Sequence, residues 1–288
     1  MADENGLVAR QRRLLAARAP LHRRASSARG AAGTWIQVNC SLFAQASQAS
    51  AYVPWAELGT VLDTWRSEGR FEQFFFMRKS PALRLRFRAS DPTARLEPVL
   101  IAWLEDAEQR NLIRSFRFAT YEPEVFLFGG PTGMAVAHHQ FDRDSRFVIE
   151  YEALTERSAI SLSRARLTLP VMHDLFRRFA EDESELWDIW QRLWRRHGCP
   201  PLPAGERVTV IDDSDVPPAL LATARLNNEH VARRLHAAEV LRRLERGPRT
   251  WLADVCTFHW NRLGLPLEER LSLIASMLHS LDPHREPQ

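Results

Sequence analysis

The stretch from Tyr121 to Ser145, YEPEVFLFGGPTGMAVAHHQFDRDS, divides the sequence into two parts with different hydrophobic periods. Before it, apolar and polar residues alternate over short segments, as in β-strands with one buried face. After it, apolar residues recur every three or four positions, as in amphipathic helices. We therefore predict an α+β fold. A mixed or antiparallel sheet packs with helices in the first half, and a mostly helical second half packs against it.

The same hydrophobic periods predict the individual strands and helices. The first half is expected to form strands over 35–43, 71–77, 83–88 and 113–120 and helices over 53–68 and 96–109. The second half is expected to form helices over 147–156, 170–180, 183–197, 217–246, 251–261 and 267–281. Within the dividing stretch, β-forming residues predict a further strand that ends at Phe128. A break at Gly129-Gly130-Pro131 and the start of a helix should follow.

The chain of 288 residues, 45% of them hydrophobic, is long enough for one sizeable core. Residues 34–288 are expected to form one domain. Residues 1–33 are rich in arginine and are expected to form a frayed or disordered arm, with electrostatic docking of an acidic partner as the alternative. The apolar segments are short and carry charges, so no membrane partner is expected. Three scattered cysteines without a CxxC motif indicate a reducing, cytoplasmic location.

The segment LRLRFR alternates apolar residues with Arg84, Arg86 and Arg88. As a strand, it would place the three guanidinium groups on one face of the sheet. The simplest interpretation is the exposed face of an edge strand, where charge discourages aggregation. The alternative is a row that holds a carboxylate through paired hydrogen bonds.

Two carboxylates, Glu122 and Glu124, precede the double glycine and would share one face of the expected strand. As a close pair, one of them would be able to hold and donate a proton. Because arginines are abundant, an ion pair between each glutamate and an arginine is the favoured interpretation. The glycine-rich segment lacks the GK[ST] ending of a P-loop, so no nucleotide site is predicted.

Four polar residues follow the glycines: His138, His139, Asp142 and Asp144. They lack the HExxH spacing of a metal site, so no metal is predicted. Asp144 and Ser145 are interpreted as a helix cap.

His259 lies between aromatic residues in FHWNR. A lone histidine in such surroundings is usually a core residue. Next to Asn261 and Arg262, near the end of a helix, it is also a candidate acid or base.

Four blocks of this sequence resemble a known family. FFFMRKSPALRLRF, TYEPEVFLFGG, GMAVAHHQFDRDS and FHWNRLGLPLEER occur in the order found in the C-terminal elimination domain of lantibiotic (LanB-type) dehydratases. Over residues 34–281 the chain is similar to the stand-alone thiopeptide-type bacteriocin biosynthesis proteins of that family. Full-length members glutamylate Ser or Thr with glutamyl-tRNA and then eliminate glutamate, leaving dehydroalanine or dehydrobutyrine. This chain is too short for the glutamylation half, so the resemblance implies a separate glutamylating partner.

The resemblance also implies site residues. The matching catalytic positions are His259, Glu124, Arg84 and Arg86, and the matching substrate-binding positions are Gly129, Gly130, Asn261 and Arg262. Leu127 stands where the family pattern has an active-site arginine, and Ala82 where a histidine is usual. The implied chemistry requires no metal or organic cofactor.

Three functions remain open on this resemblance. Elimination of glutamate is slightly favoured, because Glu124 and His259 are retained. Loss of arginine at Leu127 suits the related pyridine synthases, which join two dehydroalanines by a formal aza-[4+2] cycloaddition and release the leader peptide. The third is a non-catalytic scaffold that binds the leader. In each case the expected partner is a ribosomally made precursor peptide with a leader, which the basic arm would help to bind. No direct nucleic-acid partner is expected.

Overall fold

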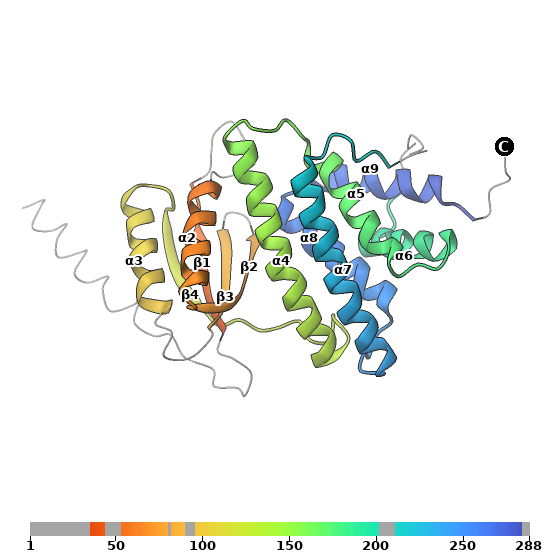
Figure 1. Cartoon of the computed structure of the whole chain (residues 1–288), viewed down its shortest axis with the longest axis horizontal. Helices are drawn as coiled ribbons and strands as arrows, with labels where there is room; N and C mark the ends of the chain where they lie inside the picture. The colour runs from red at the N-terminus through yellow and green to blue at the C-terminus, as the bar shows by residue number, and fades with distance from the viewer. Residues whose placement is uncertain (1–34, 44–52, 80–81, 90–95, 202–210, 284–288) are drawn as a thin grey trace, which may run out of the picture.

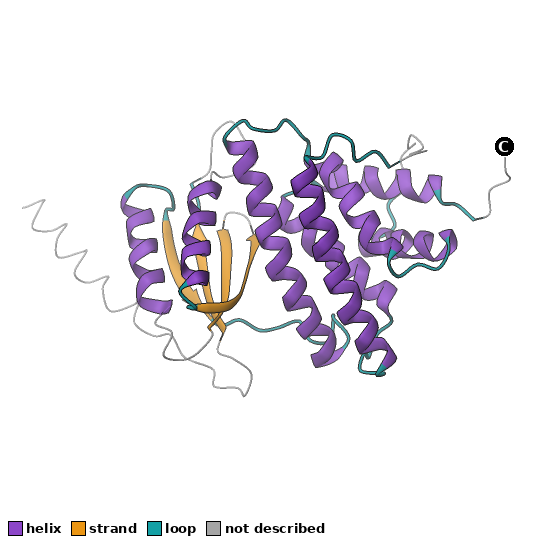
Figure 2. Ribbon diagram, in the orientation of Figure 1, coloured by secondary structure: helices purple, strands orange, loops and turns teal. Residues whose placement is uncertain are grey.

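The computed structural model describes residues 35–43, 53–79, 82–89, 96–201 and 211–283, and the expected arm over 1–33 lies outside this part. The sheet and two helices lie at one end of the molecule, and the remaining helices lie at the other (Figures 1 and 2). The elements in chain order are β1 (Trp35–Ser41), α2 (Trp55–Ser67), β2 (Phe71–Lys79), β3 (Ala82–Ala89), α3 (Leu96–Gln109), β4 (Ser115–Ala119), α4 (Gly130–Glu156), α5 (Arg164–Arg177), α6 (Glu183–Arg196), α7 (Pro218–Val240), α8 (Pro248–Leu263) and α9 (Leu267–Ser280).

The described strands form one antiparallel sheet in the order β2-β3-β1-β4. Val38 of β1 pairs with Leu85 of β3, and Leu85 also faces Phe76 of β2. The α+β class and the mostly helical second half are therefore confirmed. β3 is an inner strand, so the interpretation of LRLRFR as an edge strand is wrong.

Helices α2 and α3 cover the apolar face of the sheet. Trp65 of α2 lies 6.3 Å, centroid to centroid, from Phe87 of β3 and 6.4 Å from Trp103 of α3. Trp55, at the start of α2, lies 5.1 Å from Phe76. Because Leu83, Leu85 and Phe87 all point to this side, the arginines between them must point to the opposite face.

Helix α4 is the long helix that separates the sheet from the helical half (Figure 1). It packs against α2, β2, α7 and α8. The separate helix expected over 147–156 is the second half of α4, since no break interrupts the helix between Gly130 and Glu156. Residues at positions 134, 137, 141 and 148 are buried along one side of it, which continues the apolar stripe across the expected boundary.

Side chains from the helices satisfy the outer edge of β2. The backbone N–H of Phe74 donates to Asp142 Oδ1 at 2.9 Å, and that of Phe76 to Ser145 Oγ at 3.3 Å. The N–H of Arg78 donates to Asn261 Oδ1 at 2.9 Å. These contacts hold the edge strand against α4 and α8. Every second backbone N–H group of this part of β2, which would otherwise lack a partner, is therefore hydrogen-bonded.

Two helices of the second half, α5 and α7, differ from their expected bounds by more than three residues at one end. α5 begins at Arg164, capped by Ser163, whose hydroxyl accepts from Arg166 N at 3.2 Å, and Pro170 lies inside it. The expectation that Pro170 starts the helix was wrong, because this cap begins the helix earlier and tertiary packing tolerates the proline. α7 ends at Val240 and a turn follows, in which Arg242 has φ of 52°. Within the described residues, no helix is long and apolar enough to cross a membrane.

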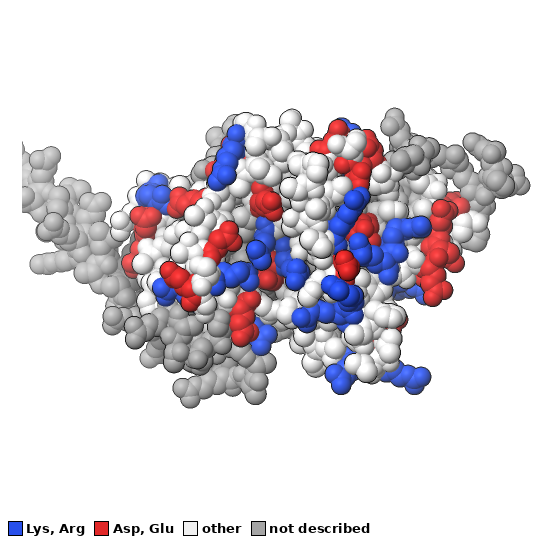
Figure 3. Space-filling view, in the orientation of Figure 1, with Lys and Arg blue, Asp and Glu red and all other residues white. Residues whose placement is uncertain are grey.

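On the face shown in Figure 3, acidic and basic side chains are mixed. Several ion pairs link neighbouring turns of one helix, such as Arg192–Asp188 in α6 and the pair of Asp174 in α5 with Arg178, the residue that caps this helix. Exposed pairs of this type contribute little to stability.

Candidate active site

The segment before α4 is a turn, not the strand expected from its sequence. β4 ends at Ala119, and the backbone turns between Val125 and Gly129. Phe128 N donates to Glu124 O at 3.2 Å and Gly130 N to Val125 O at 2.9 Å. These local bonds satisfy the backbone without a sheet partner, so they override the β-propensity of the segment. Glu122 and Glu124 therefore do not share a strand face.

The double glycine holds this turn against the segment between α7 and α8. Gly129 and Gly130 have φ of 72° and 91°, in the left-handed region that glycine adopts at little cost. Glu245 N donates to Gly129 O at 3.0 Å, and a Cβ on Gly130 would lie 2.5 Å from Glu245 Oε1. The contacts of both glycines are thus internal, and their binding of substrate stays a prediction.

Leu127 and Glu124 lie on the same turn. The Leu127 carbonyl accepts from Arg246 Nη1 at 2.7 Å, and its side chain packs against the core. The side chain of Glu124 is exposed and forms no ion pair or hydrogen bond with another described residue, and the same holds for Glu122. The expected pairing of each glutamate with an arginine is therefore not found in the described part of the chain.

The arginines of β3 share one face of the sheet but differ in their surroundings. Arg86 is 8% exposed, its Nε donates to Gln37 Oε1 at 2.7 Å, and its guanidinium carbon lies 4.5 Å from the centroid of the Tyr121 ring. Arg84 is partly exposed and makes no hydrogen bond or ion pair with another side chain of the described residues. Of the two, Arg84 is therefore the guanidinium available to a ligand.

Charges from several segments act on Arg86. Burial is the main cause that lowers its pKa, and the nearby Tyr121 and Glu124 oppose this. The positive charges of Arg84 and Arg262 lower the pKa further. Residues of β3, of the segment that follows β4 and of α8 thus all influence the charge of Arg86.

A buried carboxylate, Asp144 of α4, joins two residues of α8, His259 and Arg262. Its Oδ1 lies 2.7 Å from His259 Nδ1, and its Oδ2 accepts from Arg262 Nε at 2.6 Å. Burial alone would raise the pKa of Asp144, but His259 and Arg262 outweigh it and lower the pKa to about 2. Asp144 therefore stays ionised. It lies in mid-helix, so its expected role as a helix cap is wrong.

His259 and Arg262 are both 0% exposed. Each keeps one polar atom, Nε2 of His259 and Nη2 of Arg262, that is buried without a hydrogen-bond partner in the described part of the chain. Buried polar atoms are nearly always paired, so two orphans beside one carboxylate call for an explanation. One explanation is that a ligand pairs with them.

Met77 and two aromatic rings connect this cluster with the arginines of β3. Arg262 Nη1 lies 3.7 Å from Met77 Sδ, and Met77 is the cross-strand partner of Arg84. The guanidinium carbon of Arg262 lies 4.7 Å from the Phe141 ring centroid. Phe141 lies 5.2 Å from Phe75, over which the Arg86 guanidinium is placed at 5.1 Å. Arg86 and Arg262 thus lie against one group of apolar side chains, and Arg84 lies opposite Met77 of this group. His259 is joined to it through Asp144 and Arg262.

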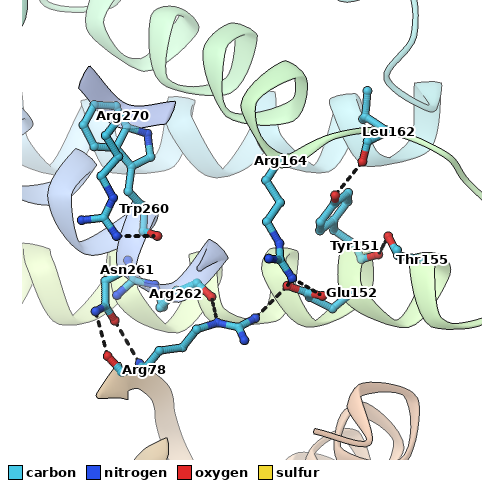
Figure 4. Close-up of polar contacts among 10 residues, drawn as sticks. All are labelled: Arg78, Tyr151, Glu152, Thr155, Leu162, Arg164, Trp260, Asn261, Arg262 and Arg270. Atoms are coloured by element: carbon cyan, nitrogen blue, oxygen red, sulfur yellow. Dashed lines mark hydrogen bonds and ion pairs between the residues drawn. The ribbon is translucent and has the colours of Figure 1, made fainter. Parts of the chain in front are cut away.

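Asn261 points to a different contact. Its Oδ1 and Nδ2 bind the backbone N–H and carbonyl of Arg78 at 2.9 and 2.8 Å (Figure 4). Arg78 in turn donates from Nε to the Arg262 carbonyl at 2.7 Å and from Nη2 to Glu152 at 2.7 Å. Both polar atoms of the amide are therefore used in fixing β2 to α8, and substrate binding by Asn261 stays a prediction.

Sequence reasoning missed Asp144 as a site residue, although one signal was present. Asp144 lies three residues after Phe141 and four before Val148, on the apolar stripe of α4. A carboxylate at such a position requires a buried partner. Among the described residues, no group of three or more His, Cys, Asp or Glu side chains is arranged to hold a metal ion.

Residues 38–281 match the family described as lantibiotic biosynthesis dehydratase C-term. The chain belongs to this family. No curated protein matches the sequence. Two solved structures share the fold. MibB from Microbispora sp. 107891, a tRNA-dependent lantibiotic dehydratase, has 20% identity and a TM-score of 0.65 over 90% of this chain, which spans 29% of MibB. TbtD, a pyridine synthase from thiomuracin biosynthesis, has 13% identity and a TM-score of 0.50 over 86% of this chain and 96% of TbtD.

Proposed function

We propose that this chain eliminates glutamate from glutamylated serine or threonine residues of a ribosomally made precursor peptide, leaving dehydroalanine or dehydrobutyrine. Membership of the lantibiotic dehydratase C-terminal family supports this class of substrate. The observation that carries the proposal is the buried Asp144–His259–Arg262 cluster, with its two unpaired polar atoms, beside the arginines of β3. A separate protein would supply the glutamylated peptide.

His259 would be the base. For this role the imidazole would be neutral, with Nδ1 donating to Asp144 Oδ1 and the Nε2 lone pair unshared. Nε2 would take the proton from Cα of the glutamylated residue. The electron pair of that C–H bond forms the Cα=Cβ double bond, the Cβ–O bond breaks, and glutamate departs as a carboxylate.

The arginines would stabilise the charges that this step creates. Arg262 Nη2 is fixed beside the base and would face the carbonyl oxygen on which negative charge develops. Arg84, partly exposed, and Arg86 would hold the carboxylates of the departing glutamate, since guanidinium groups suit carboxylates. Glu124 would orient one of these arginines or a proton carrier.

The peptide must reach His259, which is fully enclosed. Met77 is partly buried and contacts Arg262, and a methionine side chain changes its conformation easily. Movement of the Met77 side chain away from Arg262 would open a path by which a peptide bound at Arg84 reaches the buried cluster. Asn261 and the double glycine would act by fixing β2 and the turn beside this route.

One observation favours a second function. Leu127 places an apolar side chain where the family pattern has an arginine, and its backbone carbonyl is the acceptor of Arg246. Fewer positive charges suit a pyridine synthase, which must hold two dehydroalanines and has no glutamate to release.

A single assay tests these proposals. The protein is given a glutamylated precursor peptide and, separately, the same peptide with dehydroalanines already in place, and the masses are followed. Loss of glutamate from the first peptide supports elimination, and ring closure with release of the leader from the second supports pyridine formation. Tight binding with neither change would reject both reactions in favour of a leader-binding scaffold.

A further inference from the structure

Tyr121 and His138 form a hydrogen-bonded pair that the mechanism above does not use. The phenolic oxygen lies 2.8 Å from His138 Nε2 and joins the segment after β4 to α4. The Trp35 ring lies 4.5 Å from the His138 ring and 5.2 Å from the Tyr121 ring, measured between centroids. The pair is therefore held in place by aromatic packing as well as by its own bond.

The pair lies at the arginine face of the sheet. The Arg86 guanidinium carbon is 4.5 Å from the Tyr121 ring centroid, and Arg86 is itself fixed by Gln37. Tyr121 is only partly buried, while His138 behind it is buried. The tyrosine is thus the member of the pair that a peptide on this face would meet.

Both members of the pair stay uncharged near neutral pH. Burial, followed by the positive charges of Arg88 and Arg86, lowers the pKa of His138 to about 3. Burial raises the pKa of the Tyr121 phenol. The geometry allows either neutral tautomer of His138. In the tautomer with its proton on Nε2, the imidazole donates to the phenolic oxygen and leaves the phenolic O–H free to donate elsewhere. The pair is suited to aim one hydrogen bond, and it does not store a proton.

We propose that the Tyr121 hydroxyl contacts the peptide substrate and donates a hydrogen bond to the carbonyl oxygen of the residue being modified, and that His138 is a positioning residue for this hydroxyl. The inference rests on the proposed function. The inference applies to both reactions. Elimination places negative charge on the backbone carbonyl oxygen of the reacting residue, and cycloaddition uses the imidic-acid tautomer of a backbone amide. The hydroxyl, held beside Arg86, would add a donor to the one that Arg262 Nη2 supplies to this oxygen in the mechanism above.

Tyr121→Phe removes the hydroxyl and keeps the ring. With whichever peptide the wild-type protein converts, kcat/KM should fall by at least about tenfold, because one aimed donor is lost. Tyr151→Phe is the matched control: its hydroxyl donates to the Leu162 carbonyl at 2.6 Å, far along α4, and its loss should leave kcat/KM unchanged. Equal kcat/KM in Tyr121→Phe and wild type would overturn the inference.

The role of His138 is tested by pairs of variants. His138→Leu removes the donor and should lower kcat/KM about as much as Tyr121→Phe, whereas His138→Gln, which keeps an N–H, should restore part of the loss. The double variant Tyr121→Phe/His138→Leu should be no worse than Tyr121→Phe, because both changes break one unit. Additive losses would overturn the positioning role.

Failure of the proposed function gives a distinct result. If the wild-type protein converts neither the glutamylated nor the dehydroalanine peptide, the proposed reactions are wrong. The affinity of the wild type, Tyr121→Phe and Tyr151→Phe for the unmodified precursor peptide, measured by calorimetry, then tests whether Tyr121 contacts the peptide. Affinity lowered at least about fivefold in Tyr121→Phe, but not in Tyr151→Phe, would support it. Equal affinity in all three proteins would overturn it.

Discussion

Asp144 and His259 lie 115 positions apart in the sequence and meet in the core, with Oδ1 and Nδ1 separated by 2.7 Å. The second oxygen of the same carboxylate accepts from Arg262 Nε at 2.6 Å. One residue of α4 therefore sets the orientation of two residues of α8. His259 and Arg262 are three positions apart on that helix, so they face the carboxylate from neighbouring turns.

Asp144→Asn should destabilise the protein by about 3 kcal/mol, because it leaves the buried Arg262 guanidinium without its counter-charge. Urea unfolding measures the change. Asp106→Asn is the control: Asp106 pairs with Arg110 on the surface of α3, and its loss should cost less than about 1 kcal/mol. Equal effects of the two substitutions would show that the buried cluster contributes no more than a surface pair.

Asp254 should make the free energy of unfolding depend on pH. It is buried against Arg196 and lies 3.6 Å from Arg246, and burial raises its pKa from 3.8 to about 6 despite both arginines. A carboxyl group with a raised pKa in the folded state contributes stability that is present below pH 3.8 and is lost as the pH rises through 6.

Asp254→Asn stays neutral at every pH. Its free energy of unfolding, relative to that of the wild type, should therefore increase as the pH rises over this interval. Urea unfolding of both proteins at about pH 4 and about pH 7.5, on either side of the raised pKa of Asp254, measures this difference. A difference that is constant with pH would contradict the raised pKa.

Arg84 and Arg86 should respond differently to substitution. Arg84→Ala should raise KM for the glutamylated peptide with little loss of stability, since this side chain is partly exposed. Arg86→Ala should raise KM and also lower stability, because it leaves Gln37 Oε1 without its donor and removes the contacts with Phe75 and Tyr121. Initial rates and thermal unfolding of both variants check this. Normal KM in Arg84→Ala would remove that arginine from the binding site.

Gly133→Ala should destabilise the protein, although glycine to alanine within a helix usually stabilises it by about 0.5–1 kcal/mol. The added Cβ would lie 1.8 Å from the backbone oxygen of Phe128, so the turn would have to move. Gly247→Ala is the control, since its Cβ would meet no atom within 4 Å. A Gly133→Ala protein as stable as this control would show that the turn is not held tightly against α4.

The sheet was predictable because its strands keep one face apolar. In LRLRFR the alternation placed the three arginines on one face, and the register of β3 against β1 and β2 confirms it. The strand expected before the double glycine was wrong because its backbone bonds are satisfied within a turn. Short apolar segments do not distinguish these outcomes, since the deciding hydrogen bonds involve only the local backbone.

The site was predictable only in part. The family blocks indicated Arg84, Arg86 and His259, whose roles in a site stay a prediction. Arg84 lies opposite Met77, which contacts Arg262, and His259 shares the Asp144 carboxylate with Arg262. The sequence does not show that Arg86 is buried while Arg84 is available, because this depends on Gln37 and Tyr121 from other segments. Partners so distant in sequence are set by the tertiary packing of the sheet against α4 and α8.

The most direct test of the central claim uses a precursor peptide with one glutamylated serine that carries deuterium at Cα. The wild-type protein should release glutamate and produce dehydroalanine without the deuterium, as followed by mass spectrometry. His259→Ala should bind the same peptide with unchanged affinity and release no glutamate, because it lacks the base beside Asp144. Release of glutamate by His259→Ala at the wild-type rate would contradict the account.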